Sequence, residues 1–174
     1  MKYIKEYNEY VDPFNEEDWD VVEPDGTFLT WLKINHPDES KWKNITNLGC
    51  YNKGLTDLIG IDKLINLKYL HCQHNQLTEL DVTKNIKLKQ LICDHNQLTK
   101  LDVSNLDILS CQHNQLTELD VSKNINLKNL SCHNNQLTKL DLSNNINLLY
   151  LFCNNNQLKE LDLSKNIKLR HKSI

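Results

Sequence analysis

Leucine and cysteine recur along this chain at a fixed spacing from residue 45 onward. Copies of the pattern Leu-x-x-Leu-x-Cys-x-x-Asn-Gln-Leu start at Leu67, Leu88, Leu106, Leu127 and Leu148. Within each copy, the alternation Leu-x-Cys is typical of a short β-strand, whose inward residues repeat at every second position. A single copy cannot bury its own leucines, so successive copies must stack and share one core. The pattern therefore predicts a solenoid with one short strand in each turn.

Each copy continues with a second half that reads Leu-Asp-Val-Ser-Lys-Asn, as at residues 119–124. The copy that starts at Leu88 is three residues short, because Leu101-Asp102-Val103-Ser104-Asn105 runs straight into Leu106. Since the shortening precedes the next expected strand, we predict a tighter turn on the convex side. A degenerate copy opens the array at Ile45 with Lys53 in place of the expected Asn, and a last copy from Leu169 ends, uncapped, inside its expected strand.

These motifs resemble those of the leucine-rich-repeat family over residues 45–174. The Leu-Asp-Val-Ser-Lys-Asn half is similar to the short repeats of bacterial members, and Leu58-Ile59-Gly60-Ile61 is similar to internalin-type repeats. The Asn-, Lys- and Ile-rich composition also resembles repeat proteins of giant viruses. The resemblance implies an α/β-class horseshoe, a leucine-rich-repeat solenoid with a parallel sheet on its concave face and a mostly irregular convex side. It also implies protein binding, and a repeated Asn whose buried amide satisfies backbone groups of adjacent turns.

Residues 1–44 do not repeat, and we expect them to form a small helical and acidic N-terminal cap before the solenoid at 45–174. Asn15 is a candidate N-cap of a short helix. Phe28, Trp31 and Leu32 fit one helical face, which would seal the first turn of the array. The stretch from Asp12 to Asp25 is strongly acidic. It is either a solvated cap surface or a docking segment for a basic partner.

The charge balance narrows the classes of partner. A net charge of −3 and a pI near 6.1 exclude the basic surface expected of a protein that binds nucleic acid or an anionic membrane. No apolar run approaches the roughly 18 residues that span a bilayer. The N-terminus lacks the apolar core of a secretory signal peptide. We therefore expect a cytoplasmic protein, in its own cell or in a host cell.

The six cysteines mark one position of the repeat. They stand at residues 50, 72, 93, 111, 132 and 153, and no Cys-x-x-Cys motif is present. Parallel stacking would hold their Cβ atoms about 4.8 Å apart, wider than the roughly 3.8 Å that a disulfide prefers. We expect six reduced, buried thiols without the exposed thiolate that catalysis needs.

Three polar columns of the repeat allow further interpretations. His74, His95 and His113 occupy one position of successive turns, which Asn134 and Asn155 continue. Stacked rings do not converge as tetrahedral coordination requires, so a polar hydrogen-bonding ladder is favoured over a metal site. A column of aspartates is expected to cap turns, with calcium binding as the weaker alternative: Asp81, Asp102, Asp120, Asp141 and Asp162. Charges alternate in a third column, which we interpret as register control: Glu79, Lys100, Glu118, Lys139 and Glu160.

Alternate strand positions should face solvent on the concave side. Aromatic, isoleucine and polar side chains at these positions form the predicted partner-binding site: Tyr69, His71, Ile92, Asp94, Ile108, His133, Tyr150 and Phe152. No catalytic group or cofactor is expected, so the sequence favours a protein–protein interaction scaffold over an enzyme. The alternative is a structural protein that forms homodimers through its uncapped C-terminal turn.

Overall fold

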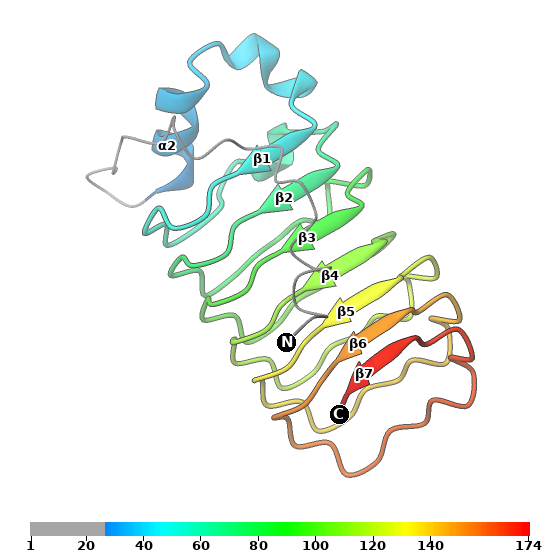
Figure 1. Cartoon of the computed structure of the whole chain (residues 1–174). Helices are drawn as coiled ribbons and strands as arrows, with labels where there is room; N and C mark the ends of the chain where they lie inside the picture. Colours follow the sequence, from blue (N-terminus) through cyan, green and yellow to red (C-terminus); the bar gives the residue numbers. More distant parts are fainter. Residues whose placement is uncertain (1–26) are drawn as a thin grey trace.

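The strand half of each repeat forms one short parallel strand. The computed structural model describes residues 27–174, and within that range seven strands form one sheet in sequence order (Figure 1). The strands are β1 (Asn47–Gly49), β2 (Tyr69–His71), β3 (Gln90–Ile92), β4 (Ile108–Ser110), β5 (Asn129–Ser131), β6 (Tyr150–Phe152) and β7 (His171–Ser173). Every neighbouring pair is parallel, so the predicted solenoid is confirmed.

The register places equivalent residues of successive turns side by side. Leu70 of β2 pairs with Leu91 of β3, and Leu91 pairs with Leu109 of β4. The central residue of each strand is a buried leucine from β1 to β6, whereas β7 carries the exposed Lys172 there. All six cysteines are buried in the same continuous core, which confirms them as markers of one core position. Each buried leucine contributes about 1.5–3 kcal/mol of apolar burial to the fold.

Within residues 27–46, two helical segments precede the first strand. They are α2 (Phe28–Asn35) and the 3₁₀ helix η2 (Glu39–Asn44), and Figure 1 shows α2 beside the β1 end of the sheet. Phe28, Trp31 and Leu32 are buried together on α2, so the predicted helical face is confirmed. These side chains and Trp42 belong to the same core as the leucines of the first turn.

The remaining predictions for the N-terminal region have different outcomes. The helix expected near Asn15 and the acidic stretch from Asp12 to Asp25 lie outside the described residues. The division into a cap at 1–44 and a solenoid at 45–174 stays a prediction. After β1, the chain turns at Gly60 into the 3₁₀ helix η3 (Ile61–Lys63). Gly60 has a φ of 101°, and a Cβ built there would lie 3.2 Å from Cδ1 of Leu29 on α2, so a residue with a side chain is disfavoured at this contact.

The shortened repeat tightens the convex side and leaves the sheet unchanged. Gln90 of β3 pairs with Ile108 of β4 in the same register as the other strands. The backbone N–H of Leu106 donates to Oδ1 of Asn124 in the next turn (3.0 Å). In the regular repeats, the equivalent N–H donates to a carbonyl of its own turn, as Leu127 does to Asn124. The predicted tighter convex turn is therefore confirmed.

Candidate functional site

A buried column of asparagines holds the strand ends in place. The amide of Asn96 donates to the carbonyls of Cys72 and Cys93, both at 3.1 Å, and its Oδ1 accepts the N–H of Leu77 at 3.0 Å. The same arrangement recurs at Asn75, Asn114, Asn135 and Asn156. We call these five residues the strand-side ladder. Their role in linking adjacent turns is as predicted, and it gives the concave face a rigid frame.

The apolar members of the predicted site lie on one face of the sheet in two groups. Tyr69, Ile92 and Ile108 come from β2, β3 and β4, and each is partly exposed. Tyr150 and Phe152 come from β6, two strands further along, and are also partly exposed. The ring of Phe152 lies 5.4 Å from that of His171 on β7. Strand β5, with polar residues at the outward positions, separates the two groups.

The expectation that every member of the site faces solvent is wrong for two residues. His71 and Asp94 are each only 8% exposed. Asp94 accepts hydrogen bonds from the hydroxyl of Ser110 (2.9 Å) and from the backbone and side-chain N–H groups of Gln112 (3.0 and 3.1 Å). Nε2 of His71 lies 3.1 Å from the Gln90 amide nitrogen. Neighbouring strands are close enough for their polar side chains to cover one another, so these residues form an internal hydrogen-bonding layer.

The pKa values of ionisable groups in this layer are shifted by their surroundings. Burial raises the pKa of Asp94, although its hydrogen bonds to Ser110 and Gln112 act in the opposite direction. His133 is half-buried and shares a hydrogen bond with Ser131 (3.2 Å). Burial, followed by the nearby charge of His113, lowers the pKa of His133. Both effects favour the neutral form of the group over its charged form.

The histidine column lies where the strands end. Ring centroids of His74 and His95 are 4.4 Å apart and those of His95 and His113 are 4.2 Å apart, with interplanar angles of 12° and 13°. The polar ladder is confirmed beyond them, where Asn134 lies 3.1 Å from Nε2 of His113 and accepts from Asn155 at 2.8 Å. The three histidine rings stack instead of hydrogen-bonding to one another. Among residues 27–174, no group of three or more possible ligands is arranged to hold a metal ion.

Sequence reasoning missed the backbone requirement at this column. All six residues there have a φ between 51° and 57°: Asn52, His74, His95, His113, Asn134 and Asn155. Among residues other than glycine, Asn, Asp and His are the types enriched in this left-handed region. The restriction of the column to Asn and His was the signal available in the sequence.

Burial along the cysteine column disfavours the thiolate form of its side chains. The thiols of Cys72 and Cys93 donate to the carbonyls of Ile92 (3.6 Å) and Ser110 (3.4 Å). Burial raises the pKa of Cys50 to about 12 and that of Cys153 to about 11. A buried thiol with so high a pKa does not supply the thiolate that nucleophilic catalysis requires.

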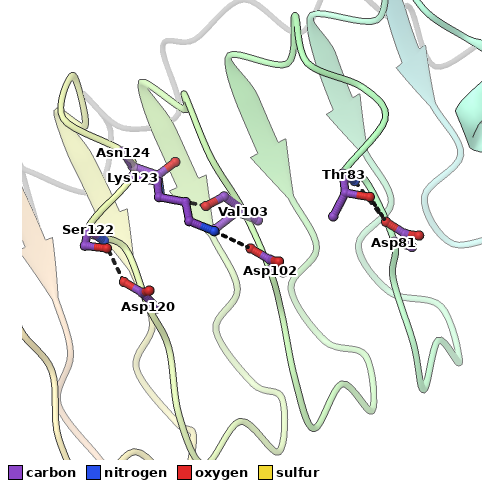
Figure 2. A network of polar contacts seen from close by, with 8 residues as sticks. All are labelled: Asp81, Thr83, Asp102, Val103, Asp120, Ser122, Lys123 and Asn124. Atoms are coloured by element: carbon purple, nitrogen blue, oxygen red, sulfur yellow. Dashed lines mark hydrogen bonds and ion pairs between the residues drawn. The ribbon is translucent and has the colours of Figure 1, made fainter.

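The aspartate column caps turns on the convex side, with one exception. Asp81 and Asp120 accept the backbone N–H of Thr83 (2.9 Å) and Ser122 (2.8 Å), as Figure 2 shows. Asp141 and Asp162 cap their turns in the same way. The prediction of turn capping is thus confirmed for four of the five. Asp102, in the short turn, instead faces Lys123 of the next turn, with Nζ and Oδ1 3.8 Å apart.

The alternating charge column does not form direct ion pairs. The ion pairs within residues 27–174 involve other side chains, and none joins neighbours of the series Glu79, Lys100, Glu118, Lys139 and Glu160. The interpretation of this column as register control stays a prediction. Long exposed side chains lose rotamer freedom on pairing, which offsets most of the Coulomb gain in water.

Comparison with known proteins gives short matches in sequence and long ones in structure. No protein-family model matches the chain. It is 40% identical to Internalin J of Listeria monocytogenes over 47 residues, which are 27% of this chain and 5% of that protein. In addition, no helix in the described residues is both long and apolar enough to cross a membrane.

Three solved structures share the solenoid. The functional domain of InlJ from Listeria monocytogenes, which includes a cysteine ladder, has a TM-score of 0.75 at 40% identity over 77% of this chain and 31% of that one. A leucine-rich-repeat protein of Leptospira interrogans has a TM-score of 0.70 at 28% identity, over 76% of this chain and 38% of that one. The internalin InlF from Listeria monocytogenes has a TM-score of 0.70 at 26% identity, over 75% of this chain and 41% of that one. The chain thus spans less than half of each relative. With the twenty-one-residue repeat, its asparagine column and its parallel sheet, these likenesses show that the chain belongs to the leucine-rich-repeat family.

Proposed function

We propose that this chain is a protein-interaction scaffold that binds a macromolecular partner on its concave sheet face. One observation carries the proposal: five large apolar side chains remain partly exposed on that face, namely Tyr69, Ile92, Ile108, Tyr150 and Phe152. Aromatic side chains on a rigid frame are the groups that most often dominate binding energy, because burying them against a partner costs little conformational entropy. The likeness to leucine-rich-repeat proteins supports an interaction scaffold in general.

The polar residues between the two apolar groups support the same face. These are the outward residues of β5: Asn129 is partly exposed, and Ser131 is buried in the hydrogen-bonding layer. A partner would find apolar anchor points at β2–β4 and at β6, with hydrogen-bonding groups between them. That distribution matches the apolar anchors and polar surroundings of specific interfaces.

We also propose that the protein acts without catalysis or a cofactor, in a cytoplasm. Buried thiols with raised pKa values support a role without catalysis, and the cysteines also bear on the location. Six unbridged cysteines support a cytoplasm, since a reducing compartment keeps thiols free. Protein recovered from cells and alkylated after unfolding should show six reactive thiols by mass spectrometry. Recovery of disulfide-linked pairs, or fractionation outside the cytoplasm, would contradict this part of the proposal.

The binding face can be tested with a photo-crosslinking amino acid. Placed at Tyr150 on the concave face, it should give a covalent adduct with the partner in cells. Placed at Ile146, which is 50% exposed on the convex side, it should give none.

Replacing Tyr69, Tyr150 and Phe152 with Ala should then weaken capture of the identified partner at least about tenfold, with an unchanged circular dichroism spectrum. Ile65→Ala with Ile146→Ala, two exposed positions away from that face, serves as the matched convex control and should bind normally. Capture that survives the triple substitution would show that the concave face is not the binding surface.

A second candidate function is self-association through the last turn. Leu158, Leu161, Leu163 and Leu169 pack against the core but are only partly buried, unlike the corresponding apolar residues of earlier turns. Two such ends could bury these side chains against each other. Light scattering over a range of concentrations should then show a dimer that Leu161→Lys dissociates, and a monomer at every concentration would remove this candidate.

A further inference from the structure

A second ladder of asparagines runs along the convex side. Asn85, Asn124, Asn145 and Asn166 are each 3% exposed or less. The amide of Asn145 donates to the carbonyls of Val121 (3.0 Å) and Asn124 (2.9 Å) in the preceding turn. Asn166 and Asn85 each bind two carbonyls of the turn before them in the same way. We call these four residues the convex ladder.

The short turn breaks this ladder at one place. Residues 101–106 read Leu-Asp-Val-Ser-Asn-Leu, whereas residues 119–127 read Leu-Asp-Val-Ser-Lys-Asn-Ile-Asn-Leu. The short turn therefore lacks the segment Lys-Asn-Ile. Within the described residues, no side-chain amide reaches the carbonyls of Val82 and Asn85 in the turn before it. Each carbonyl keeps one backbone hydrogen bond, from the N–H of Asn85 (3.0 Å) and of Leu88 (2.8 Å).

A cavity of about 230 Å³ occupies the place of the missing residues. Its apolar lining comes from Val82, Leu88, Val103 and Leu106, and its polar lining includes Asp102, Ser104 and Lys123. Figure 2 shows the Lys123 side chain reaching Asp102 of the short turn, with Asp81 and Thr83 on the preceding turn. Ile86 and Ile125, which stand next to the ladder asparagines in the flanking regular turns, are 71% and 58% exposed. We call this cavity the convex notch.

A second cavity of about 270 Å³ lies at Leu163, Asn166 and Leu169, which are the equivalents of Val82, Asn85 and Leu88.

The chemistry of the notch defines what would fill it. The carbonyls of Val82 and Asn85 are both free to accept a further hydrogen bond. In every regular turn, the equivalent pair of carbonyls accepts both hydrogens of one amide nitrogen, so a group with two N–H bonds would fit here. The charges of Asp102 and Lys123 oppose each other at the rim, so a neutral carboxamide fits better than a cation. The apolar lining suits an adjacent branched aliphatic side chain. The ladder asparagines of a second folded copy of this chain are buried, so they cannot supply that amide.

We propose that the convex notch binds an extended segment of a partner protein that inserts an asparagine side chain followed by an isoleucine or similar aliphatic residue. The segment would supply from outside the two side chains that the short turn lacks. The amide would donate to the carbonyls of Val82 and Asn85, and the aliphatic side chain would lie between Ile86 and Ile125. This site is on the opposite side from the concave face and does not depend on the function proposed above.

A peptide titration followed by NMR tests the proposal on the full chain. The probe is an acetylated and amidated hexapeptide, Ser-Lys-Asn-Ile-Asn-Leu, which copies residues 122–127. It should cause saturable shifts in the backbone amide signals of residues 82–88 and 103–106. A matched peptide with Asp in place of the first Asn should bind at least about tenfold more weakly, because a carboxylate offers oxygens to carbonyl oxygens. Absence of saturable shifts, or equal binding of the two peptides, would overturn the proposal.

Filling the notch from within provides the complementary test. Inserting Lys-Asn-Ile between Ser104 and Asn105 recreates the sequence of residues 119–127. This variant should raise the thermal midpoint by about 2–4 °C or more and lose the peptide-induced shifts at residues 82–88. Ser104→Trp, at an exposed position on the rim, should block the same shifts without any insertion. Any shifts at residues 163–169 should persist in both variants. If residues 82–88 still respond to the peptide in either folded variant, the notch is not its binding site.

Discussion

The two asparagine ladders differ in what they do for the backbone, although both are buried and built from the same side chain. Asn135 of the strand-side ladder accepts the N–H of Leu116 through Oδ1 and donates to the carbonyls of Cys111 and Cys132. Asn145 of the convex ladder only donates, and its buried Oδ1 has no hydrogen-bond partner. The strand-side ladder thus supplies the acceptor for an otherwise unpaired N–H. Apart from Asn124, which accepts the N–H of Leu106 from the short turn, the convex ladder adds a second bond to carbonyls that already have one.

This difference explains where the chain tolerates a deletion. The strand-side ladder continues without a gap from Asn75 to Asn156, through the turn in which the convex ladder is broken. A buried N–H without an acceptor costs more than a carbonyl that loses one of two bonds. The convex side could therefore lose three residues, and the register between β3 and β4 did not change.

The largest effect on stability is expected when single asparagines are removed, one variant for each ladder. Asn135→Ala leaves the buried N–H of Leu116 without its acceptor and should lower the free energy of unfolding by about 3 kcal/mol. Asn145→Ala removes only second bonds to two carbonyls, and should lower it by about 1 kcal/mol. Urea unfolding followed by circular dichroism measures both. Equal losses would show that the two ladders do not differ in the way described.

A deletion copied from the short turn should have an intermediate effect. Removing residues 144–146 gives the sequence Leu-Asp-Leu-Ser-Asn-Leu, which matches residues 101–106 in pattern. The fold should survive with a loss of about 1–2 kcal/mol, because two carbonyls of the preceding turn lose the amide of Asn145. Hydrogen exchange of the Cys132 N–H, which donates to Phe152 across β5 and β6, checks that the strand pairing is intact. Fast exchange at Cys132 would show that the convex segment is needed for the register.

The smallest expected effect is a pH dependence at the strand ends, beside the strand-side ladder. Burial, followed by the charges of His113, His74 and His133, lowers the pKa of His95 below its usual 6.5, and burial lowers that of His133. The unfolded chain therefore binds more protons than the folded chain as the pH falls through about 6.5, and stability should decline from there downward. Asp94 acts in the opposite sense at lower pH, because burial raises its pKa.

Substitution of the shifted histidines isolates this effect. His95→Asn keeps a residue type that the column accepts at a φ of 55° in Asn134 and Asn155. It should reduce the loss of stability between pH 7.5 and 5.5, and adding His133→Asn should reduce it further. Urea midpoints at the two pH values provide the measurement. An unchanged difference between them in the double variant would assign the pH dependence to other groups.

Several features of the candidate site could be predicted from particular residues. The leucine and cysteine spacing sufficed for the strand positions, because one residue in two must face the core along a strand. Tyr69, Ile92, Ile108, Tyr150 and Phe152 followed from the same alternation and lie on the expected face. The burial of His71 and Asp94 could not be predicted in this way, because it depends on contacts with the next turn. His71 lies against Gln90, and Asp94 accepts hydrogen bonds from Ser110 and Gln112.

The sequence by itself determined the repeat, the order and parallel pairing of the strands, the core position of the cysteines and the side on which three residues are missing. These follow from periodicity, since stacking equivalent turns is the way such short units can bury their leucines. Only the tertiary structure decided that the histidines stack at a left-handed strand end and that the short turn leaves a notch beside two carbonyls. Both features depend on contacts between turns. Such contacts are determined by where groups distant in the sequence meet in space, which the spacing of residues along the chain does not specify.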